Sequence, residues 1–197
     1  MAAVPVLEAV VSLAAGLGLA AACGFRIFVP LLVASLAARY GQLPLAAGFD
    51  WVGSGPALIA LATATVLEVG AYYVPWLDHA LDTVATPAAM LAGVLAAASV
   101  VTDLPPALKW TVAIIGGGGA AGLIQGTSVL FRLKSTALTG GVANPVIATV
   151  ELLGATTTAV LAVLLPLVCL AGVIALLVFG FRTTGRILFG RRPTAPS

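Results

Sequence analysis

Charged residues are scarce in this chain. Asp, Glu, Lys and Arg make up 8% of its 197 residues, whereas hydrophobic residues make up 61%. Soluble domains carry roughly 25% charged residues, which cover a surface that faces water. The composition therefore excludes a soluble domain and indicates an integral membrane protein. We expect an all-α membrane fold, because a helix satisfies its own backbone hydrogen bonds in lipid.

Residues that bind metals or carry out covalent chemistry are equally few. The two cysteines, Cys23 and Cys169, lie far apart in apolar runs and are expected to be packing residues. The single histidine, His79, lies near Asp78 and Asp82, which is a poor set for a metal site. No nucleophile–base pair with usable spacing is present. We therefore expect no enzyme activity, no catalytic residue, no metal and no cofactor.

Basic residues gather only at the end of the chain. A net charge of +2 with scattered basic residues does not suggest nucleic acid as a partner. Arginines are frequent in the last stretch, at Arg182, Arg186, Arg191 and Arg192. Because Lys and Arg resist translocation, this end is expected to be cytoplasmic. Residues 1–182 are predicted to form one polytopic transmembrane domain, followed by a basic cytoplasmic tail at 183–197.

The chain contains long apolar stretches and two shorter ones. A helix needs about 20 apolar residues to cross the hydrocarbon core. Five stretches satisfy this length, namely Val4–Gly24, Pro56–Val74, Leu81–Val101, Trp110–Phe131 and Leu153–Phe181. The shorter stretches are Ile27–Ala38 and Ser135–Val150, the second interrupted by Gly140, Gly141 and Pro145. We expect these two to be re-entrant or broken helices, buried by protein or wetted by water.

One pattern occurs twice. Ala14–Arg26 and Ala120–Arg132 both read AAGL, then seven residues, then Phe-Arg. Each copy ends a long apolar stretch and precedes a short one. This predicts two repeat units, at about 4–74 and 110–181, joined by a linking helix at about 81–101. If both short helices re-enter, the units are inverted, as in many transporters. The alternative is seven crossings with parallel repeats.

Charge fixes the expected orientation but not the number of crossings. Both arrangements place the N-terminus outside and the C-terminus in the cytoplasm. With five crossings Arg132 and Lys134 lie outside, whereas with seven crossings Arg39 and Lys109 lie there. The positive-inside rule is satisfied equally well by both arrangements. Length favours five crossings.

Three segments carry a family resemblance. They are GFRIFVPLLVASLAARYG, LEVGAYYVPWLDHALDTV and FRLKSTALTGGVANPVIATVELL. Together they resemble the bacterial membrane family catalogued as domain of unknown function 4126, over roughly Gly16 to Leu165. The resemblance implies a multi-span protein of the bacterial inner (cytoplasmic) membrane. It implies no activity.

Five ionisable residues lie in or beside apolar stretches, and one of them, Glu8, is expected at the membrane interface. A charge at the bilayer centre costs about 2.5–3.5 kcal/mol, so such a residue usually faces protein or a wet cavity. Glu68 and Glu151 are candidate proton or cation sites. The alternatives are a wet position near the interface for Glu68 and a helix cap for Glu151. Arg26 and Arg132, expected at turns, either pair with the glutamates, bind an anion, or extend to the headgroups.

A second group of polar and glycine residues surrounds an Asn-Pro step. Asn144 is expected to cap a half-helix that begins at Pro145. The alternative is a kinked helix that is fully packed. Tyr72 and Tyr73 are expected at the membrane interface, where aromatic residues are frequent. The remaining candidate substrate ligands are Gln125, Ser135, Thr139, Gly140 and Gly141.

These residues favour a small secondary transporter or channel. An ion or small solute would pass a polar site at the midplane, coupled to a proton or cation at the glutamates. Lipid or lipid-carrier translocation is one alternative, with the arginines binding a lipid phosphate. A non-transporting membrane subunit is another. The expected partners are membrane lipids, the solute or ion, and further copies in a homo-oligomer.

Overall fold

The computed structural model describes residues 3–102 and 104–188, and nearly all of them are helical. The side chains of Asp78, His79 and Asp82, and residues 189–197 of the tail, lie outside the described part. The elements are α1 (Ala3–Cys23), α2 (Phe28–Arg39), η1 (Asp50–Gly53), α3 (Gly55–Ala71), α4 (Pro75–Val100), α5 (Pro106–Thr111), η2 (Val112–Gly118), α6 (Gly119–Thr139), α7 (Asn144–Leu164) and α8 (Pro166–Leu188).

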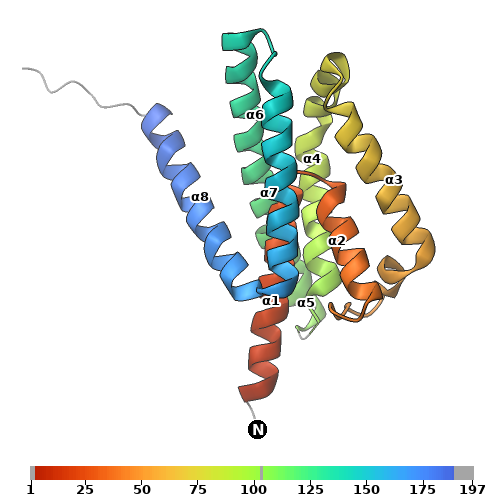
Figure 1. Ribbon diagram of the computed structural model, residues 1–197. Helices are drawn as coiled ribbons and strands as arrows, with labels where there is room; N and C mark the ends of the chain where they lie inside the picture. The colour runs from red at the N-terminus through yellow and green to blue at the C-terminus, as the bar shows by residue number, and fades with distance from the viewer. Residues whose placement is uncertain (1–2, 103, 189–197) are drawn as a thin grey trace, which may run out of the picture.

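Successive helices run in alternating directions along one axis (Figure 1). Helix α1 rises from the N-terminal end of the bundle, and the short helix α2 returns toward that end. Helices α3, α4, the continuous unit α5–η2–α6, α7 and α8 then alternate in the same way. The turn between α1 and α2 lies well inside the bundle, below the upper ends of α6 and α7.

Three helices are long and apolar enough to cross a membrane, which agrees with a multi-pass membrane protein. They are Val6–Cys23, Pro106–Thr139 and Asn144–Leu164. Three other predicted elements have helical counterparts: Pro56–Val74 in α3, Leu81–Val101 in α4, and Ile27–Ala38 in α2. Their apolar portions within the described part are shorter than those of the first three helices. The sequence therefore located these helices, and within residues 3–102 and 104–188 three of them are long and apolar enough to span.

Two of the predicted boundaries are wrong. The stretch Leu153–Phe181 contains a break at Leu165, whose φ of −138° and ψ of 65° end α7 directly before Pro166. Proline disfavours the helical conformation in the residue before it, so the chain turns into α8. The stretch Ser135–Val150 is no short helix. It contains the end of α6, a turn with Gly140 and Gly141 at φ of 64° and 88°, and the start of α7.

The predicted inverted arrangement is also wrong. Helices α1 and α6, which carry the two AAGL copies, rise in the same direction, and α2 and α7 both return (Figure 1). Inverted units would place the two copies in opposite directions. The N-terminal end of α1 and the far end of α8 lie at opposite ends of the bundle.

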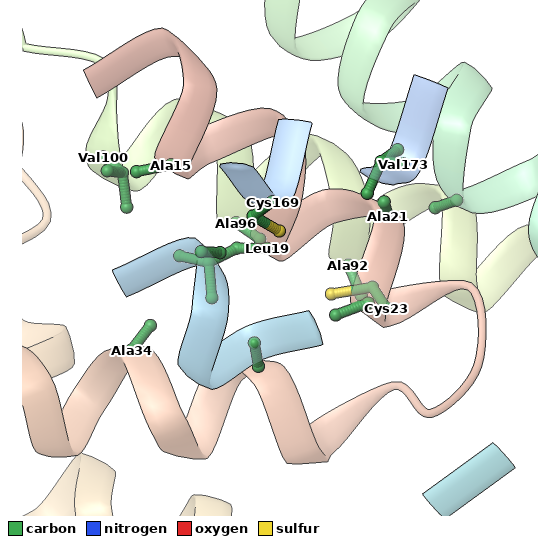
Figure 2. Close-up of a cluster of buried hydrophobic side chains, with 14 of the residues drawn as sticks. Ala15, Leu19, Ala21, Cys23, Ala34, Ala92, Ala96, Val100, Cys169 and Val173 are labelled. Atoms are coloured by element: carbon green, nitrogen blue, oxygen red, sulfur yellow. The ribbon is translucent and has the colours of Figure 1, made fainter. Parts of the chain in front are cut away.

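The core is built from small side chains around α1. Figure 2 shows Leu19, Cys23, Ala92, Ala96 and Cys169 among its members, contributed by α1, α4 and α8. Both cysteines are free and buried, as expected of packing residues. Alanine at so many core positions allows the helix backbones to approach closely, which favours van der Waals packing between helices in lipid.

Glycine brings α4 and η2 still closer. A Cβ on Gly93 would lie 2.8 Å from the carbonyl oxygen of Gly117, and a Cβ on Gly117 would lie 2.8 Å from that of Gly93. Gly116, Gly117 and Gly118 therefore serve helix contact at the end of the π-helical segment η2, whereas Gly119 begins α6 and has no neighbour within 4 Å of an added Cβ. Single π-helical turns inside α-helices are frequent at functional sites.

Candidate functional site

The site begins at the turn that follows α1. Gly24 is packed so tightly on α6 that an added Cβ would lie 2.6 Å from the carbonyl oxygen of Ala121. Arg26 follows two residues later and is only 2% exposed. Helix α2 starts immediately afterwards, and its N-cap residue Ile27 supplies no side-chain hydrogen bond to the first turn. The backbone N–H groups at this helix start therefore need partners from elsewhere.

Glu68 of α3 supplies those partners. Its Oε1 accepts a hydrogen bond from the backbone N–H of Ile27 at 2.7 Å, and its Oε2 accepts one from Phe28 at 3.0 Å. The N-terminus of a helix carries partial positive charge, which favours a carboxylate there. With 8% of its surface exposed, Glu68 is buried within the protein, not wet at an interface.

Arg132 and Glu151 form an ion pair between α6 and α7. Arg132 Nε donates to Glu151 Oε1 at 3.1 Å, and Arg132 Nη2 donates to Glu151 Oε2. Arg132 was expected at a turn, but it lies inside α6, seven residues before its end. Glu151 was considered as a helix cap, but α7 begins seven residues earlier, at Asn144. Both residues therefore lie about 10 Å from the α6–α7 turn.

Arg26, at the turn before α2, links the region around Glu68 to the ion pair between Arg132 and Glu151. Its Nη2 donates to the carbonyl oxygen of Ala148 at 2.8 Å and lies 3.4 Å from Glu151 Oε2. The Tyr72 ring, at the end of α3, lies beneath both guanidiniums. The ring centroid is 3.7 Å from Arg26 Cζ and 4.4 Å from Arg132 Cζ. Arg26, Glu68, Tyr72, Arg132 and Glu151 are called the charge cluster below.

The charge cluster combines both signs of charge. Among the described residues it contains two guanidiniums and two carboxylates, and all four side chains are buried. Isolated buried charges are too costly to persist, whereas a hydrogen-bonded and balanced set can be tolerated in low dielectric. Arg26 and Arg132, at 2% and 3% exposure, do not extend to the surface. The interpretation of these arginines as headgroup-seeking side chains is therefore wrong.

The Asn-Pro step has a local structural role. Asn144 is 5% exposed, and its Nδ2 donates to Thr136 Oγ1 at 3.2 Å. It does not cap α7, because the N-cap position is Ala143. The N–H of Ala143 instead donates to Thr139 Oγ1 at 3.3 Å, and the Thr139 hydroxyl donates to the carbonyl oxygen of Ser135 at 2.8 Å. These contacts hold the α6–α7 turn.

The predicted candidates separate into three places along α6 and the turn that follows it. Four of the five ionisable residues meet in the charge cluster. Thr139, Gly140 and Gly141 lie at the turn, about two helical turns away, and are not brought to the cluster. Gln125 lies two turns away in the other direction and is 4% exposed. The cluster is thus deep in the bundle, but nearer the α6–α7 turn than the middle of the 34-residue helix Pro106–Thr139.

Tyr72 is the member of the cluster that the sequence interpretation missed. It was expected at the membrane interface but is 6% exposed, inside the protein. Its position four residues after Glu68 could have indicated this, because residues four apart share one face of a helix. Its neighbour Tyr73 lies nearer the surface, where its hydroxyl is 3.0 Å from Thr149 Oγ1 and links the end of α3 to α7.

Comparison with known families gives a match over residues 13–186, which includes every member of the charge cluster. The chain belongs to the family described as Domain of unknown function (DUF4126). The resemblance inferred from the three sequence segments is thereby confirmed. No curated protein and no solved structure matches the chain. The role of the site in this family member is therefore argued from its geometry.

Proposed function

We propose that the protein is a small transporter or channel of the bacterial inner membrane that moves an ion or small solute past the charge cluster. The observation that carries the proposal is the shared carboxylate of Glu151, which contacts both Arg26 and Arg132 inside the bundle. A group held by two partners can exchange one of them for a solute. Glu68 and Glu151 are the proposed coupling carboxylates.

The energetics of buried ion pairs favour a functional role for the cluster. Replacing a buried ion-pair network by well-packed apolar residues is often neutral or stabilising, so stability alone rarely requires one. Ionisable residues inside membrane proteins usually mark ion or substrate pathways. Four such residues converge here in a chain with only 8% charged residues. Their convergence favours transport over a passive structural role.

A stripe of buried polar residues on α6 extends from the charge cluster. Gln125, Ser128 and Arg132 are all buried, at 4%, 8% and 3% exposure. Their spacing of three and four residues places them on one face of the helix. Such a stripe favours a polar path that leads from the cluster along α6 toward the middle of the bundle.

Flux measurements on proteoliposomes test the proposal. The full chain is reconstituted, and proton, sodium, potassium and anion movements are followed with dyes and isotopes under imposed gradients. We expect wild-type flux above that of empty vesicles. We expect Glu68→Gln and Glu151→Gln each to lower it about tenfold or more, the effect of losing about 1.4 kcal/mol at the coupling site.

The matched control is Glu8→Gln, which removes an exposed carboxylate on α1. Its flux should equal that of the wild type. Equal flux from wild type, Glu68→Gln and Glu151→Gln would remove both residues from the coupling mechanism. No flux above empty vesicles for any of these ions or anions would count against transport itself.

Lipid translocation receives less support from the geometry. That hypothesis requires the arginines to meet a phosphate headgroup, yet both are buried and face Glu151. No feature of the described residues favours a lipid over a small solute. The burial of both arginines therefore favours the transporter hypothesis over lipid translocation.

A further inference from the structure

We propose that α3 is a gate over the charge cluster, held closed in this structure by a hydrogen bond between Tyr73 and Thr149. On opening, the end of α3 swings away from α7 and uncovers a path to Arg26. This inference rests on the proposed transport function and names the part of the chain that regulates access to its site. The turn that follows α3 lies at the same end of the bundle as the α6–α7 turn, so the path opens toward that end (Figure 1).

Helix α3 buries almost nothing except members of the charge cluster. Among residues 55–71, all of which the structure describes, Glu68 is the one buried residue, and the buried Tyr72 follows as the C-cap. Ile59, Val66 and Leu67 are exposed, and the helix packs mainly on α2 and η1. In lipid there is no hydrophobic force that drives helices together, so exposed apolar side chains do not hold α3 in place.

The two ends of α3 are held in different ways. Before its start, the buried Val52 of η1 accepts a hydrogen bond from Ser35 Oγ of α2 at its carbonyl oxygen, at 2.6 Å. At its far end, the contacts made by Glu68, Tyr72 and Tyr73 are polar or aromatic. The fixed point of a swing is therefore beside η1, and the moving part is the end that reaches the cluster.

The first part of α4 can move together with α3. The two helices are joined by the short turn at residues 72–74, and α4 contains Pro87 about three turns after its start. A proline inside a helix cannot donate to the carbonyl oxygen four residues earlier, which weakens or kinks the helix there. Helix α3 and the start of α4 thus form a hairpin with pivots beside η1 and at Pro87.

The hydrogen bond between Tyr73 and Thr149, called the latch below, joins this hairpin to α7. The Thr149 hydroxyl donates its single proton to the carbonyl oxygen of Pro145 at 2.8 Å. The Tyr73 hydroxyl, 3.0 Å from Thr149 Oγ1, is therefore the donor in the latch. Tyr73 is exposed, so water competes for this bond, and the net contribution of such a bond is small. A contact of this strength can break and form again repeatedly.

Arg26 is the group that opening would make accessible. Its Nε and Nη1 atoms are buried and have no hydrogen-bond partner among the described residues. Buried donors without partners are uncommon in native proteins. Because Arg26 is only 2% exposed, a solute reaches these donors only after an element of the cluster moves. Helix α3 is suited to that movement, since it contributes buried groups to the cluster but buries no apolar side chain within residues 55–71.

Thiol accessibility in the purified full chain measures the opening. Ala148 of α7 is 1% exposed and its carbonyl oxygen accepts from Arg26, so the thiol of Ala148→Cys reports water at the cluster. We expect this thiol to react slowly with a charged methanethiosulfonate reagent in detergent. Adding Tyr73→Phe or Thr149→Val should raise the reaction rate about fivefold, because each removes one hydrogen bond of the closed state.

Thr156→Val is the matched control for the latch variants. Thr156 also carries an exposed hydroxyl on α7, but this hydroxyl donates within the helix itself. Its loss should leave the rate unchanged. The same chains without Ala148→Cys give the background from the buried Cys23 and Cys169. Equal rates for the two latch variants and the control would overturn the gate.

A tether across the latch separates this inference from the transport proposal. Tyr73→Cys and Thr149→Cys are combined and joined by a short bifunctional methanethiosulfonate reagent in proteoliposomes. We expect flux to fall about tenfold or more, because the gate can no longer open, and to return when a reducing agent releases the tether. Each single cysteine variant treated in the same way should keep its flux.

Each outcome decides one of the two proposals. Unchanged flux in the tethered chain overturns the gate and leaves transport intact. Faster thiol reaction in the latch variants, without flux from any vesicle, would support the gate and count against transport. The tether also decides if Ala148→Cys fails to fold, since it leaves the cluster itself unaltered.

Discussion

The guanidinium of Arg26 lies over the ring of Tyr72, with Cζ 3.7 Å from the ring centroid. Arg132 also lies over this ring, at 4.4 Å. An aromatic ring attracts a cation through its negative face, and the attraction reaches about 2 kcal/mol where water is excluded. Tyr72 therefore holds together two like charges that would otherwise repel.

The aromatic ring of Tyr72 should stabilise the protein more than an aliphatic side chain at the same position would. Tyr72→Leu removes the aromatic face beneath both guanidiniums, whereas Tyr72→Phe keeps it. We expect Tyr72→Leu to be less stable than Tyr72→Phe by about 1–2 kcal/mol. Thermal unfolding of both variants in the same detergent measures the difference. Equal melting temperatures for Phe and Leu at this position would show that the ring contact does not stabilise the cluster.

Glu68 should stabilise the start of α2. Glu68→Ala removes the acceptors for the N–H groups of Ile27 and Phe28. Hydrogen bonds to a charged group contribute about 1.5–3 kcal/mol. We expect faster hydrogen exchange at these two amides and a lower melting temperature, with Glu68→Gln intermediate because its amide keeps one oxygen.

The control for this prediction is Glu8→Gln, which changes an exposed carboxylate on a different helix. It should leave exchange at Ile27 and Phe28 unchanged. Unaltered protection of these amides in Glu68→Ala would mean that another group satisfies the helix start.

The contact between Gly93 and Gly117 should tolerate no side chain. A Cβ at Gly93 would also lie 2.7 Å from Ala121 Cβ, and a Cβ at Gly117 would lie 2.8 Å from Ala97 Cβ. Overpacking of this kind costs about 1–3 kcal/mol. We expect Gly93→Ala and Gly117→Ala to lower the melting temperature and to separate α4 from η2.

Gly126 provides the matched comparison for these two substitutions. It lies in α6, and a Cβ there would meet nothing within 4 Å. Alanine is the better helix former by about 1 kcal/mol, so Gly126→Ala should be neutral or stabilising. Similar losses for all three substitutions would show that helix flexibility, and not close approach, explains the glycines.

The direction of the helices predicts which basic residues face each side of the membrane. Arg39 and Lys109, in α2 and α5, lie at the N-terminal end of the bundle, whereas Lys134 lies toward the opposite end, with the far end of α8 (Figure 1). Because Arg182 and Arg186 follow in α8, we expect this second end to be cytoplasmic. Arg39→Cys should then react with an impermeant thiol reagent added outside intact cells, and Lys134→Cys only after permeabilisation.

The background for this measurement is low, because the native Cys23 and Cys169 are both buried. Arg39 and Lys134 are exposed, so neither replacement should disturb packing. Labelling of Lys134→Cys from outside, with protection of Arg39→Cys, would reverse the orientation.

The sequence by itself determined the class of protein and the residues worth attention. Scarce charge and long apolar stretches indicated helices in a membrane, because a helix satisfies its own backbone hydrogen bonds in lipid. The same scarcity singled out Arg26, Glu68, Arg132 and Glu151, since an ionisable residue in an apolar stretch needs a partner. These inferences depend on composition and local sequence, which a single chain contains in full.

Only the tertiary structure decided which of these residues meet, and how. Arg26 lies 122 positions before Ala148, whose carbonyl oxygen accepts its hydrogen bond. Such a contact depends on the directions and crossing of whole helices, which local periodicity does not encode. The same reason explains why the duplicated AAGL pattern suggested an inverted pair, while α1 and α6 run in one direction. The relative direction of α1 and α6 depends on whether the chain reverses at each turn between them, before α2, α3, α4 and α5, and local sequence does not show this.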